Sequence, residues 1–364
     1  TLSSDMDNTD TVKIFYEDTI ANKIKVLGPD VNASAYRFEP VDRDTIRYGL
    51  GAVKGTGEQA VNVILAARNN GGPFKDLFDF CQRCDKRMVN RRTIEALIRA
   101  GAFDSLDSNR HKLLASVGIA MEFAEQSEKN AMQSSLFDLG DVAEEHAPQY
   151  VDMLPWDERS QLMEEKTALG FFFSGHPYDS YKPELSRFIR RSLSQLQPAK
   201  EFQTLAGIVV GVRTQMTRRG KMLFVQLDDG TAMVEVSVFN ELFEAERRKI
   251  LTDAILVVEG KVSYDDFSGG NRVVAERLMT LGEARARFAK HLRLQLTPAT
   301  ADAQRLRTLL QPFTPGNAPV RLRYRQASAE CELLLGNAWQ VNLDDELLEA
   351  LNLWLNKENV AVVY

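Results

Sequence analysis

The decapeptide Tyr-Gly-Leu-Gly-Ala-Val-Lys-Gly-Thr-Gly, residues 48–57, leads directly into a segment of helical spacing from Glu58 to Arg68. Three apolar residues of that segment share one helical face: Ala60, Ile64 and Ala67. The glycines permit a tight hairpin and leave backbone N–H groups uncovered at the start of the helix. Such groups can hold a DNA phosphate without reading a base. The stretch therefore predicts a helix-hairpin-helix.

A second unit of the same kind follows in the chain. Asn90 is a candidate N-cap, and Gly101 lies where a left-handed C-cap belongs. An apolar stripe runs between them: Ile94, Leu97 and Ile98. Tandem hairpins would follow the backbone of a duplex, and six residues are candidates for duplex contact: Lys54, Gly55, Thr56, Gly57, Arg91 and Arg92. The alternative is a plain helical bundle with glycine caps.

The charge is unevenly distributed along the chain. From Arg43 to Lys112 there are 13 Lys/Arg and 8 Asp/Glu, a net of +5, although the whole chain carries −6. From Leu113 to Lys166 there are 12 Asp/Glu and 3 Lys/Arg, a net of −9. A basic module beside an acidic linker fits DNA binding, and it equally fits two halves that attract each other.

The pentapeptide Gln133-Ser134-Ser135-Leu136-Phe137 lies in the acidic, aperiodic part, after an amphipathic segment at 108–126. We expect it to lie extended in a tether, where Leu136 and Phe137 could enter a hydrophobic pocket of a partner while Gln133 fixes the register. The alternative is that the apolar pair pins the tether onto a neighbouring domain.

From Phe202 to Leu281 the pattern changes to that of strands. Five strand-like runs appear, with a helical segment at 241–250 between the third and the fourth: 206–215, 222–227, 232–238, 254–262 and 272–280. This order predicts a five-stranded OB-fold β-barrel, a fold that binds single strands through aromatic and basic side chains. The candidates for single-stranded DNA are Arg213, Arg218, Arg219, Lys221 and Phe224, with Tyr264 and Phe267 beside them. The alternative is that Phe224 and Phe267 belong to the barrel core.

The last segment, 289–364, predicts a small α+β domain without a catalytic signature, and hence a docking module. Alternating strands are expected at 292–296 and 320–324, and helices at 306–313 and 347–355, the latter capped near Asp344.

Several classes of site are excluded by spacing. Residues 49–57 do not form a dinucleotide fingerprint, because the glycine spacing is wrong and no acidic residue ends a second strand, nor a Walker loop, because Lys54 precedes the last glycines. Cys81 and Cys84 have the spacing of half a zinc site, but no second pair exists, and we expect ordinary buried or half-buried thiols and no metal. His176 has no partner at a catalytic spacing and is expected to be structural. No apolar run reaches the length of a membrane span.

Taken together, the order of parts closely resembles that of the C-terminal third of the alpha, catalytic subunit of bacterial DNA polymerase III, a C-family replicative polymerase. The residues that carry the resemblance are 48–55, 90–92, 101–104, 175–177 and 265–270. The resemblance implies a multidomain α+β architecture: a fingers-like tail at 1–42, tandem hairpins at 43–130, a tether with a clamp-binding motif at 131–155, a helical connector at 156–201, an OB-fold at 202–288 and a tau-binding-like domain at 289–364.

The same resemblance implies functions for these parts. The hairpins would contact duplex DNA, Gln133, Leu136 and Phe137 would bind the beta sliding clamp, and the last domain would bind the tau subunit of the clamp loader in the cytoplasm. The parent polymerase is expected to use magnesium held by palm aspartates. We find no counterpart of these in the sequence and expect a fragment that needs no cofactor and does not polymerise alone. A stand-alone DNA-binding adaptor or repair protein remains an alternative, although a ligase would need a Lys-x-Asp-Gly motif, which is absent.

Overall fold

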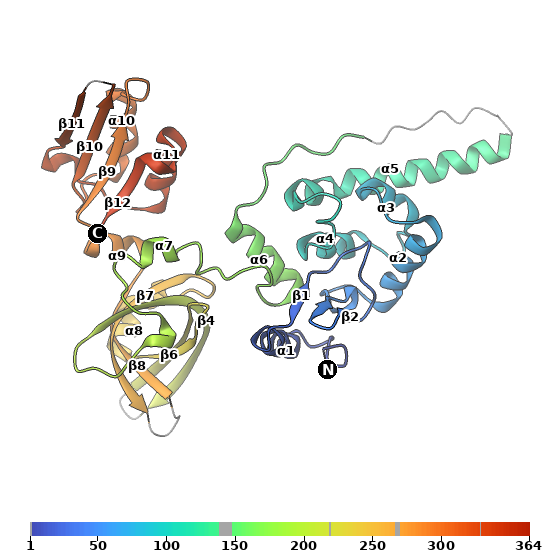
Figure 1. Cartoon of the computed structure of the whole chain (residues 1–364), viewed down its shortest axis with the longest axis horizontal. Helices are drawn as coiled ribbons and strands as arrows, with labels where there is room; N and C mark the ends of the chain where they lie inside the picture. The colour runs from blue at the N-terminus through green and yellow to red at the C-terminus, as the bar shows by residue number, and fades with distance from the viewer. Residues whose placement is uncertain (1, 138–147, 218–219, 266–269, 328) are drawn as a thin grey trace. The chain divides into compact units, whose positions relative to one another are not determined.

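The structure, a computed structural model, describes residues 2–137, 148–217, 220–265, 270–327 and 329–364. It divides into two compact units, Thr1–Pro177 and Tyr178–Tyr364, which are described separately (Figure 1). The division falls inside the predicted connector 156–201, so its first helix belongs to the first unit and its remainder to the second.

The first unit is mostly helical and carries one small sheet. The sheet has the order β1-β3-β2, with β1 (Lys25–Leu27) parallel to β3 (Thr45–Arg47) and β2 (Glu39–Asp42) antiparallel to it. The helices are α1 (Thr9–Ala21), η1 (Leu50–Ala52), α2 (Glu58–Gly71), α3 (Leu77–Arg83), α4 (Arg91–Arg99), α5 (Arg110–Phe137) and α6 (Glu158–Leu169). Their apolar faces meet in a single buried cluster.

The hairpin helices begin and end close to where the sequence predicts. Asn90 caps α4 by accepting a hydrogen bond from Thr93 N at 3.1 Å, and its stripe of Ile94, Leu97 and Ile98 is buried. Gly101 follows α4 with φ +84°, a left-handed conformation that favours glycine. The helix α2 extends three residues past the predicted end, to Gly71, and Gly72 then turns the chain with φ +77°.

The pentapeptide 133–137 does not lie in an extended segment. Helix α5 begins at Arg110, two residues after the predicted start, and runs on to Phe137. The expectation of an extended tether from residue 131 is therefore wrong for its first seven residues. Ala131, Met132, Gln133 and Leu136 are strong helix formers, and no glycine or proline stops the helix before them. The remainder of the tether up to residue 147 lies outside the described residues.

A buried charge network ties α6 to the hairpin helices. The side chain of Glu165, on α6, is fully buried, and its Oε1 lies 2.9 Å from Nη1 of Arg110 at the start of α5. Arg110 also meets Asp104 through Nη2–Oδ2 at 2.6 Å. The second oxygen of Glu165 accepts backbone N–H groups of Phe173 and Ser174. Because each buried charge has a partner, this network fixes the C-terminal end of the unit.

The second unit begins with a five-stranded closed barrel, as predicted. The strands are β4 (Gln203–Thr217), β5 (Gly220–Asp228), β6 (Met233–Val238), β7 (Ile255–Asp265) and β8 (Gly270–Met279), in the order β4-β5-β6-β8-β7. Helix α8 (Asn240–Glu246) lies between the third strand and the fourth. Strand β6 pairs parallel with β8, and β4 pairs with β7 to close the barrel. This is the topology of an OB-fold.

The rest of the second unit is a small α+β domain. Its sheet has the order β11-β10-β9-β12, covered by α10 (Ala303–Leu310) and α11 (Asp345–Leu355). The strands β9 (His291–Leu296) and β10 (Val320–Gln326) are the two predicted ones. The edge strands β11 (Ala329–Leu334) and β12 (Val360–Val363) were not predicted. Every residue of β11 is exposed, so its sequence lacks the apolar alternation that marks a half-buried strand.

A second buried arginine joins the parts of this unit. Arg285, on α9 (Leu281–Phe288), is 4% exposed and bonds Glu184 of α7 (Lys182–Leu185) at 2.7 Å and Asp345 of α11 at 2.6 Å. The pKa of this guanidinium is raised: burial opposes its charge, but the bonds to the two carboxylates outweigh burial. The connector, the barrel and the last domain thus share one ionic junction.

Candidate nucleic-acid interface

The predicted phosphate loop forms a tight turn that opens helix α2. Val53 O accepts a hydrogen bond from Thr56 N at 3.1 Å, and Gly55 takes the left-handed conformation at φ +80°. Gly57 is the N-cap of α2, with φ −73° and ψ 157°, and no side chain caps the helix. A Cβ atom placed on either glycine would meet no heavy atom within 4 Å, so the backbone of both faces open space.

A second helix start lies beside the same loop. Thr93, in the first turn of α4, donates from Oγ1 to the carbonyl oxygen of Gly55 at 3.4 Å. The N-termini of α2 and α4 therefore lie near one another, and Arg91 and Arg92 are the first two residues of α4. Both helix N-termini carry partial positive charge, and that of α2 also has uncapped N–H donors, so this surface suits an anion.

The remaining candidates differ in their availability. Lys54 donates its backbone N–H to Ala168 O at 2.8 Å, and its Nζ lies 3.2 Å from the place where a Cβ on Gly170 would stand. Its ammonium therefore lies at the C-terminal end of α6, a favourable place for a cation. The side chain of Thr56 is only 6% exposed, and its buried Oγ1 has no hydrogen-bond partner among the residues that the structure describes. Arg92 is exposed at the start of α4.

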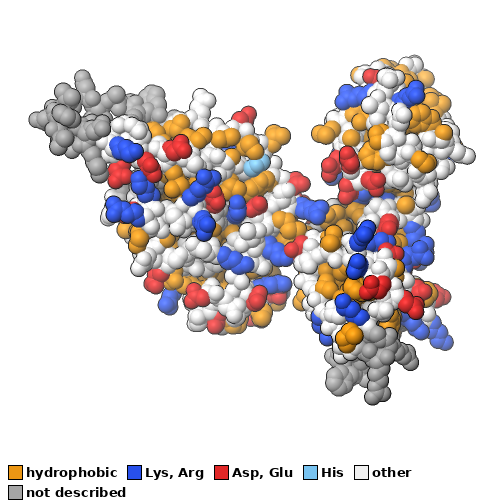
Figure 2. All heavy atoms as spheres, turned by 180° about the vertical axis from the view of Figure 1, so that it is seen from behind, with side chains coloured by type: hydrophobic (Ala, Val, Ile, Leu, Met, Phe, Trp, Pro, Cys, Tyr) orange, Lys and Arg blue, Asp and Glu red, His pale blue; other side chains and the backbone are white. Residues whose placement is uncertain are grey.

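Two carboxylates at this surface were not anticipated from the sequence. Glu95 binds Arg91 through Oε1–Nε at 2.7 Å, and Glu58 lies in the first turn of α2. Spacing could have revealed the first, because Arg91 and Glu95 are four residues apart on one helix. Both carboxylates lower the positive potential that a phosphate would meet. Figure 2 likewise shows basic and acidic side chains interspersed on the face it presents.

On the barrel, two of the predicted single-strand contacts lie together on the outer face of β4 and β5. Arg213 and Phe224 are cross-strand partners, and the guanidinium carbon of Arg213 lies 4.1 Å from the centre of the Phe224 ring. Phe224 is only 8% exposed and lies outside the cluster that fills the barrel. Phe224 is thus buried, as the alternative held, but on the outer side of the sheet, where Arg213 covers it, so its face is not open to a base.

Glu235, which the sequence analysis missed, completes this group. Its carboxylate accepts from Nη2 of Arg213 at 2.8 Å and from Nε at 3.1 Å. Only the strand register brings Glu235 to Arg213, because Glu235 lies on the next strand, diagonal to Arg213 across Phe224. No local sequence pattern reveals this placement. The ion pair neutralises Arg213, the one arginine predicted to bind single-stranded DNA that lies within the described residues.

Of the other predicted barrel contacts, some lie within the described residues and some do not. Lys221 lies with its Nζ 5.0 Å from the centre of the Phe243 ring, and Tyr264 is 57% exposed. Arg218, Arg219 and Phe267 lie outside the described residues. In the first unit, Gln133, Leu136 and Phe137 have helical backbone in the last two turns of α5.

The cysteines and His176 differ in their surroundings. Cys81 and Cys84 are both buried, as predicted, and burial raises the pKa of each thiol to about 12, whereas Cys331 is exposed. Because the thiolate is the metal-binding form, this environment disfavours ligation. Within the described ranges, no three His, Cys, Asp or Glu side chains gather as a metal site, and no helix is long and apolar enough to cross a membrane. The ring of His176 packs edge-on against Phe172.

Comparison with known families assigns three parts of the chain. Residues 23–113 match a helix-hairpin-helix motif, residues 203–281 an OB-fold nucleic acid binding domain, and residues 305–355 the C-terminal domain of DNA polymerase III subunit alpha. Fold and site thus define a multidomain protein with nucleic-acid-binding modules.

Comparison with individual proteins gives the family. The chain is 43% identical to DNA polymerase III subunit alpha of Neisseria meningitidis serogroup A over 100% of its length, and 36% identical to that of Escherichia coli K12 over 100%. It spans 32% of each relative. Among solved structures, the second OB-fold domain of replication protein A from Methanococcus maripaludis aligns with 21% identity and a TM-score of 0.21, covering 25% of this chain and 93% of that one. This chain belongs to the DNA polymerase III alpha-subunit family and corresponds to its C-terminal part.

Proposed function

We propose that this chain is the DNA-, clamp- and clamp-loader-binding region of a bacterial replicative polymerase, acting in the cytoplasm. In this proposal the hairpin module holds duplex DNA, the barrel lies near the single-stranded template, residues 133–137 engage the beta sliding clamp, and the last domain docks the tau subunit. The polymerase chemistry and its magnesium ions belong to another part of the parent protein. The observation that carries the proposal is the uncapped start of α2 beside the start of α4, within the matched hairpin motif.

The geometry favours contact with the DNA backbone over contact with bases. Gly55 and Gly57 expose backbone atoms and no side chain, so they offer donors to a phosphate and nothing to a base edge. The affinity for duplex should therefore be independent of sequence and should fall steeply with salt.

The clearest test is the substitution Gly57→Val. Gly57 has an extended backbone that valine adopts without strain, and nothing stands in the way of the new side chain. The variant should fold, but its isopropyl group should keep a phosphate from the N–H groups of α2. We expect duplex affinity to fall about tenfold, equally for all sequences, in a fluorescence-anisotropy titration of the whole chain.

The chain offers a matched control for this variant. Gly336 is also an uncapped helical N-cap, with φ −62° and ψ 163°, and is equally open, but it lies in the last domain. Gly336→Val should leave duplex affinity unchanged. If Gly57→Val and Gly336→Val both bind duplex as the unaltered chain does, the start of α2 is not the duplex contact and the proposed role of the hairpin module is wrong.

A further inference from the structure

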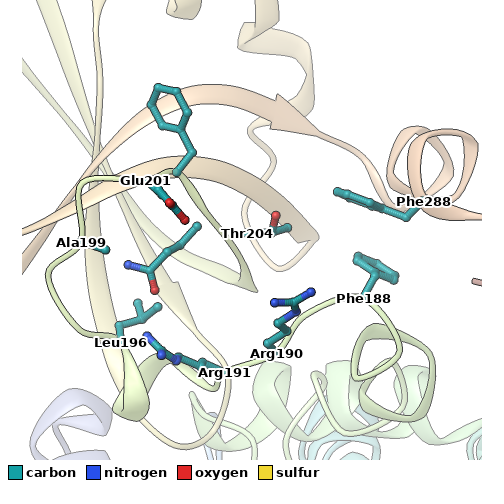
Figure 3. Close-up of a pocket in the computed structure, with 10 residues that line it drawn as sticks. Phe188, Arg190, Arg191, Leu196, Ala199, Glu201, Thr204 and Phe288 are labelled. Carbon is teal, nitrogen blue, oxygen red and sulfur yellow. The ribbon is translucent and has the colours of Figure 1, made fainter.

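The second unit contains a pocket that none of the proposed contacts uses. Its volume is about 520 Å³, and it is formed by the end of the connector, the loop before β4, the first residues of β4 and the end of α9 (Figure 3). It shares no residue with the outer barrel face that carries Arg213 and Phe224. Volumes of this size are typical of small-ligand sites.

The pocket is equipped to hold an anion. Arg190 and Arg191 are consecutive, exposed and line it, and neither makes an ion pair or hydrogen bond with any residue that the structure describes. Figure 3 shows the guanidinium of Arg190 pointing into the hollow, with Glu201 and Thr204 on its far side. Glu201 is the one carboxylate among the lining residues, so the lining carries a net positive charge. Two unpaired guanidinium groups are the usual recognition elements for phosphate.

The pocket also presents aromatic surface. Phe202 lines it and remains 62% exposed. On another side, Phe188 and Phe288 stack with ring centres 4.9 Å apart and planes 15° apart. Tyr364 packs against Phe188 at 5.0 Å, so this aromatic wall is fixed from behind. Aromatic faces beside free guanidinium groups are the combination that binds a base and its phosphate together.

The loop that forms the pocket is held in place by the barrel. The carbonyl oxygen of Leu196 accepts a hydrogen bond from Nδ2 of Asn271 at 2.7 Å, and Ala199 N donates to Val262 O at 3.1 Å. Both anchors come from the barrel strands β7 and β8. A ligand would therefore find the pocket formed in advance and would spend little free energy on ordering it.

We propose that this pocket binds a nucleoside phosphate, most naturally one nucleotide of a single strand that passes the barrel. The arginines Arg190 and Arg191 hold the phosphate, Phe202 stacks on the base, and the carboxylate of Glu201 accepts an N–H group of the base. An acidic peptide would satisfy the arginines but would leave Phe202 unused. The inference deepens the proposed single-strand contact, on which it rests in part, and adds a second place of contact to it.

The test compares ligands and variants of the whole chain in anisotropy titrations. The probes are an oligo-dT of about 12 nucleotides, within the range of one OB-fold, an abasic strand of equal length, and free thymidine monophosphate. The variants are Phe202→Ala and the double change Arg190→Gln with Arg191→Gln. Arg248→Gln is the matched control, because Arg248 is equally exposed on η3 (Arg247–Lys249) and does not line the pocket.

We expect Phe202→Ala to weaken oligo-dT binding about tenfold without affecting the abasic strand. The double arginine variant should weaken both strands and reduce the salt slope by about 0.7, since the two arginines hold one phosphate and each phosphate of a single strand contributes about 0.7. Binding of the free nucleotide, if lost in the same variants, would show that the pocket accepts the same chemistry from that source. Arg248→Gln should change none of these values.

Three results would overturn the inference. Unchanged oligo-dT binding in Phe202→Ala and in the double arginine variant would remove the pocket from the strand path. Equal binding of oligo-dT and abasic strand would show that the pocket reads charge alone. Absence of all single-strand and nucleotide binding, with duplex binding intact, would contradict this inference but not the proposal for the hairpin.

Discussion

At the scale of single residues, the most informative contact is the pair Arg213–Glu235. It lies on the outer face of the barrel, where the strand-binding surface of an OB-fold is found, and it occupies the arginine that would meet a phosphate. Arg213 also covers Phe224, so one ion pair masks both predicted contacts. A strand that binds there must first displace the carboxylate.

This arrangement predicts an unusual gain of affinity. Glu235→Gln keeps the size of the side chain but removes the negative charge, so the affinity for single-stranded DNA should rise about two- to fivefold at low salt. Stability should change by less than about 1 kcal/mol, because the pair is largely exposed. Filter binding and a melting curve measure the two effects.

The last domain supplies the control for this substitution. Arg321 and Glu332 form a similar exposed cross-strand pair at 2.9 Å, far in sequence from the barrel. Glu332→Gln removes the same charge and should leave single-strand affinity unchanged. Equal gains in both variants would mean that only net charge matters and that the barrel face has no special part.

At the scale of elements, the N-cap of helix α6 stabilises the helix that carries Glu165 into the buried charge network. Asp157 accepts from Ser160 N at 2.8 Å, and hydrogen bonds from Ser160 hold the pKa of its carboxyl below the usual value. The helix carries Glu165 into the buried charge network and ends at Gly170, beside Lys54. Its start is therefore coupled to the position of the hairpin loop.

We expect Asp157→Ala to destabilise the first unit by about 1 kcal/mol at neutral pH, the ordinary cost of a lost N-cap. Because the folded pKa is lowered, the contribution is complete above the unfolded pKa of about 4 and is lost as pH falls through the folded value. The difference in melting temperature from the unaltered chain should thus shrink in acid. Asp152→Ala, an exposed carboxylate nearby, should change neither value; a pH-independent difference for Asp157→Ala would contradict the capping role.

Helix α5 changes how the clamp-binding hypothesis must be tested. Leu136 and Phe137 end a helix, so an extended binding mode would require the last turns of α5 to unwind. The terminal turns of a helix are held by few contacts, so unwinding them costs little free energy. We expect Leu136→Ala with Phe137→Ala to abolish clamp binding in calorimetry, because each side chain would contribute roughly 1.5–3 kcal/mol on burial in a pocket.

The same double variant should melt at nearly the temperature of the unaltered chain. Gln133→Ala should weaken clamp binding less, because it removes hydrogen bonds and no apolar burial. A marked fall in the melting temperature of the double variant would show that Leu136 and Phe137 stabilise this chain itself and do not serve to fill a partner's pocket.

The elements also show what sequence reasoning can and cannot supply. The barrel strands and α4 were predictable because half-buried strands and capped helices leave local periodic signals. The fully exposed β11 leaves none, and the end of α5 depends on the absence of a stop signal. The pairings Arg213–Glu235 and Arg285–Glu184–Asp345 arise from tertiary register, and no short window of sequence contains either of them. The pocket around Arg190 is lined by one continuous stretch, 188–204, and by Phe288 of α9, and no local pattern of residues marks that stretch as a pocket.

At the scale of the whole molecule, one chain combines several weak contacts. The hairpin surface has carboxylates among its basic groups, the barrel face is masked, and a single apolar pair supports only about micromolar affinity for a clamp. Linking such contacts raises the effective concentration of each for the next, typically giving a hundredfold or greater gain, about 10²–10⁴. Processivity would then come from linkage, and each contact could still be released.

The measurement that tests this most directly is the affinity of the whole chain for primed DNA that carries the sliding clamp, set against its affinity for the primed DNA and for the clamp separately. We expect the clamp-bearing DNA to be held at least about a hundredfold more tightly than either partner alone. The gain should disappear in both Gly57→Val and the Leu136→Ala, Phe137→Ala variant. Equal affinity for DNA with and without the clamp would contradict the account.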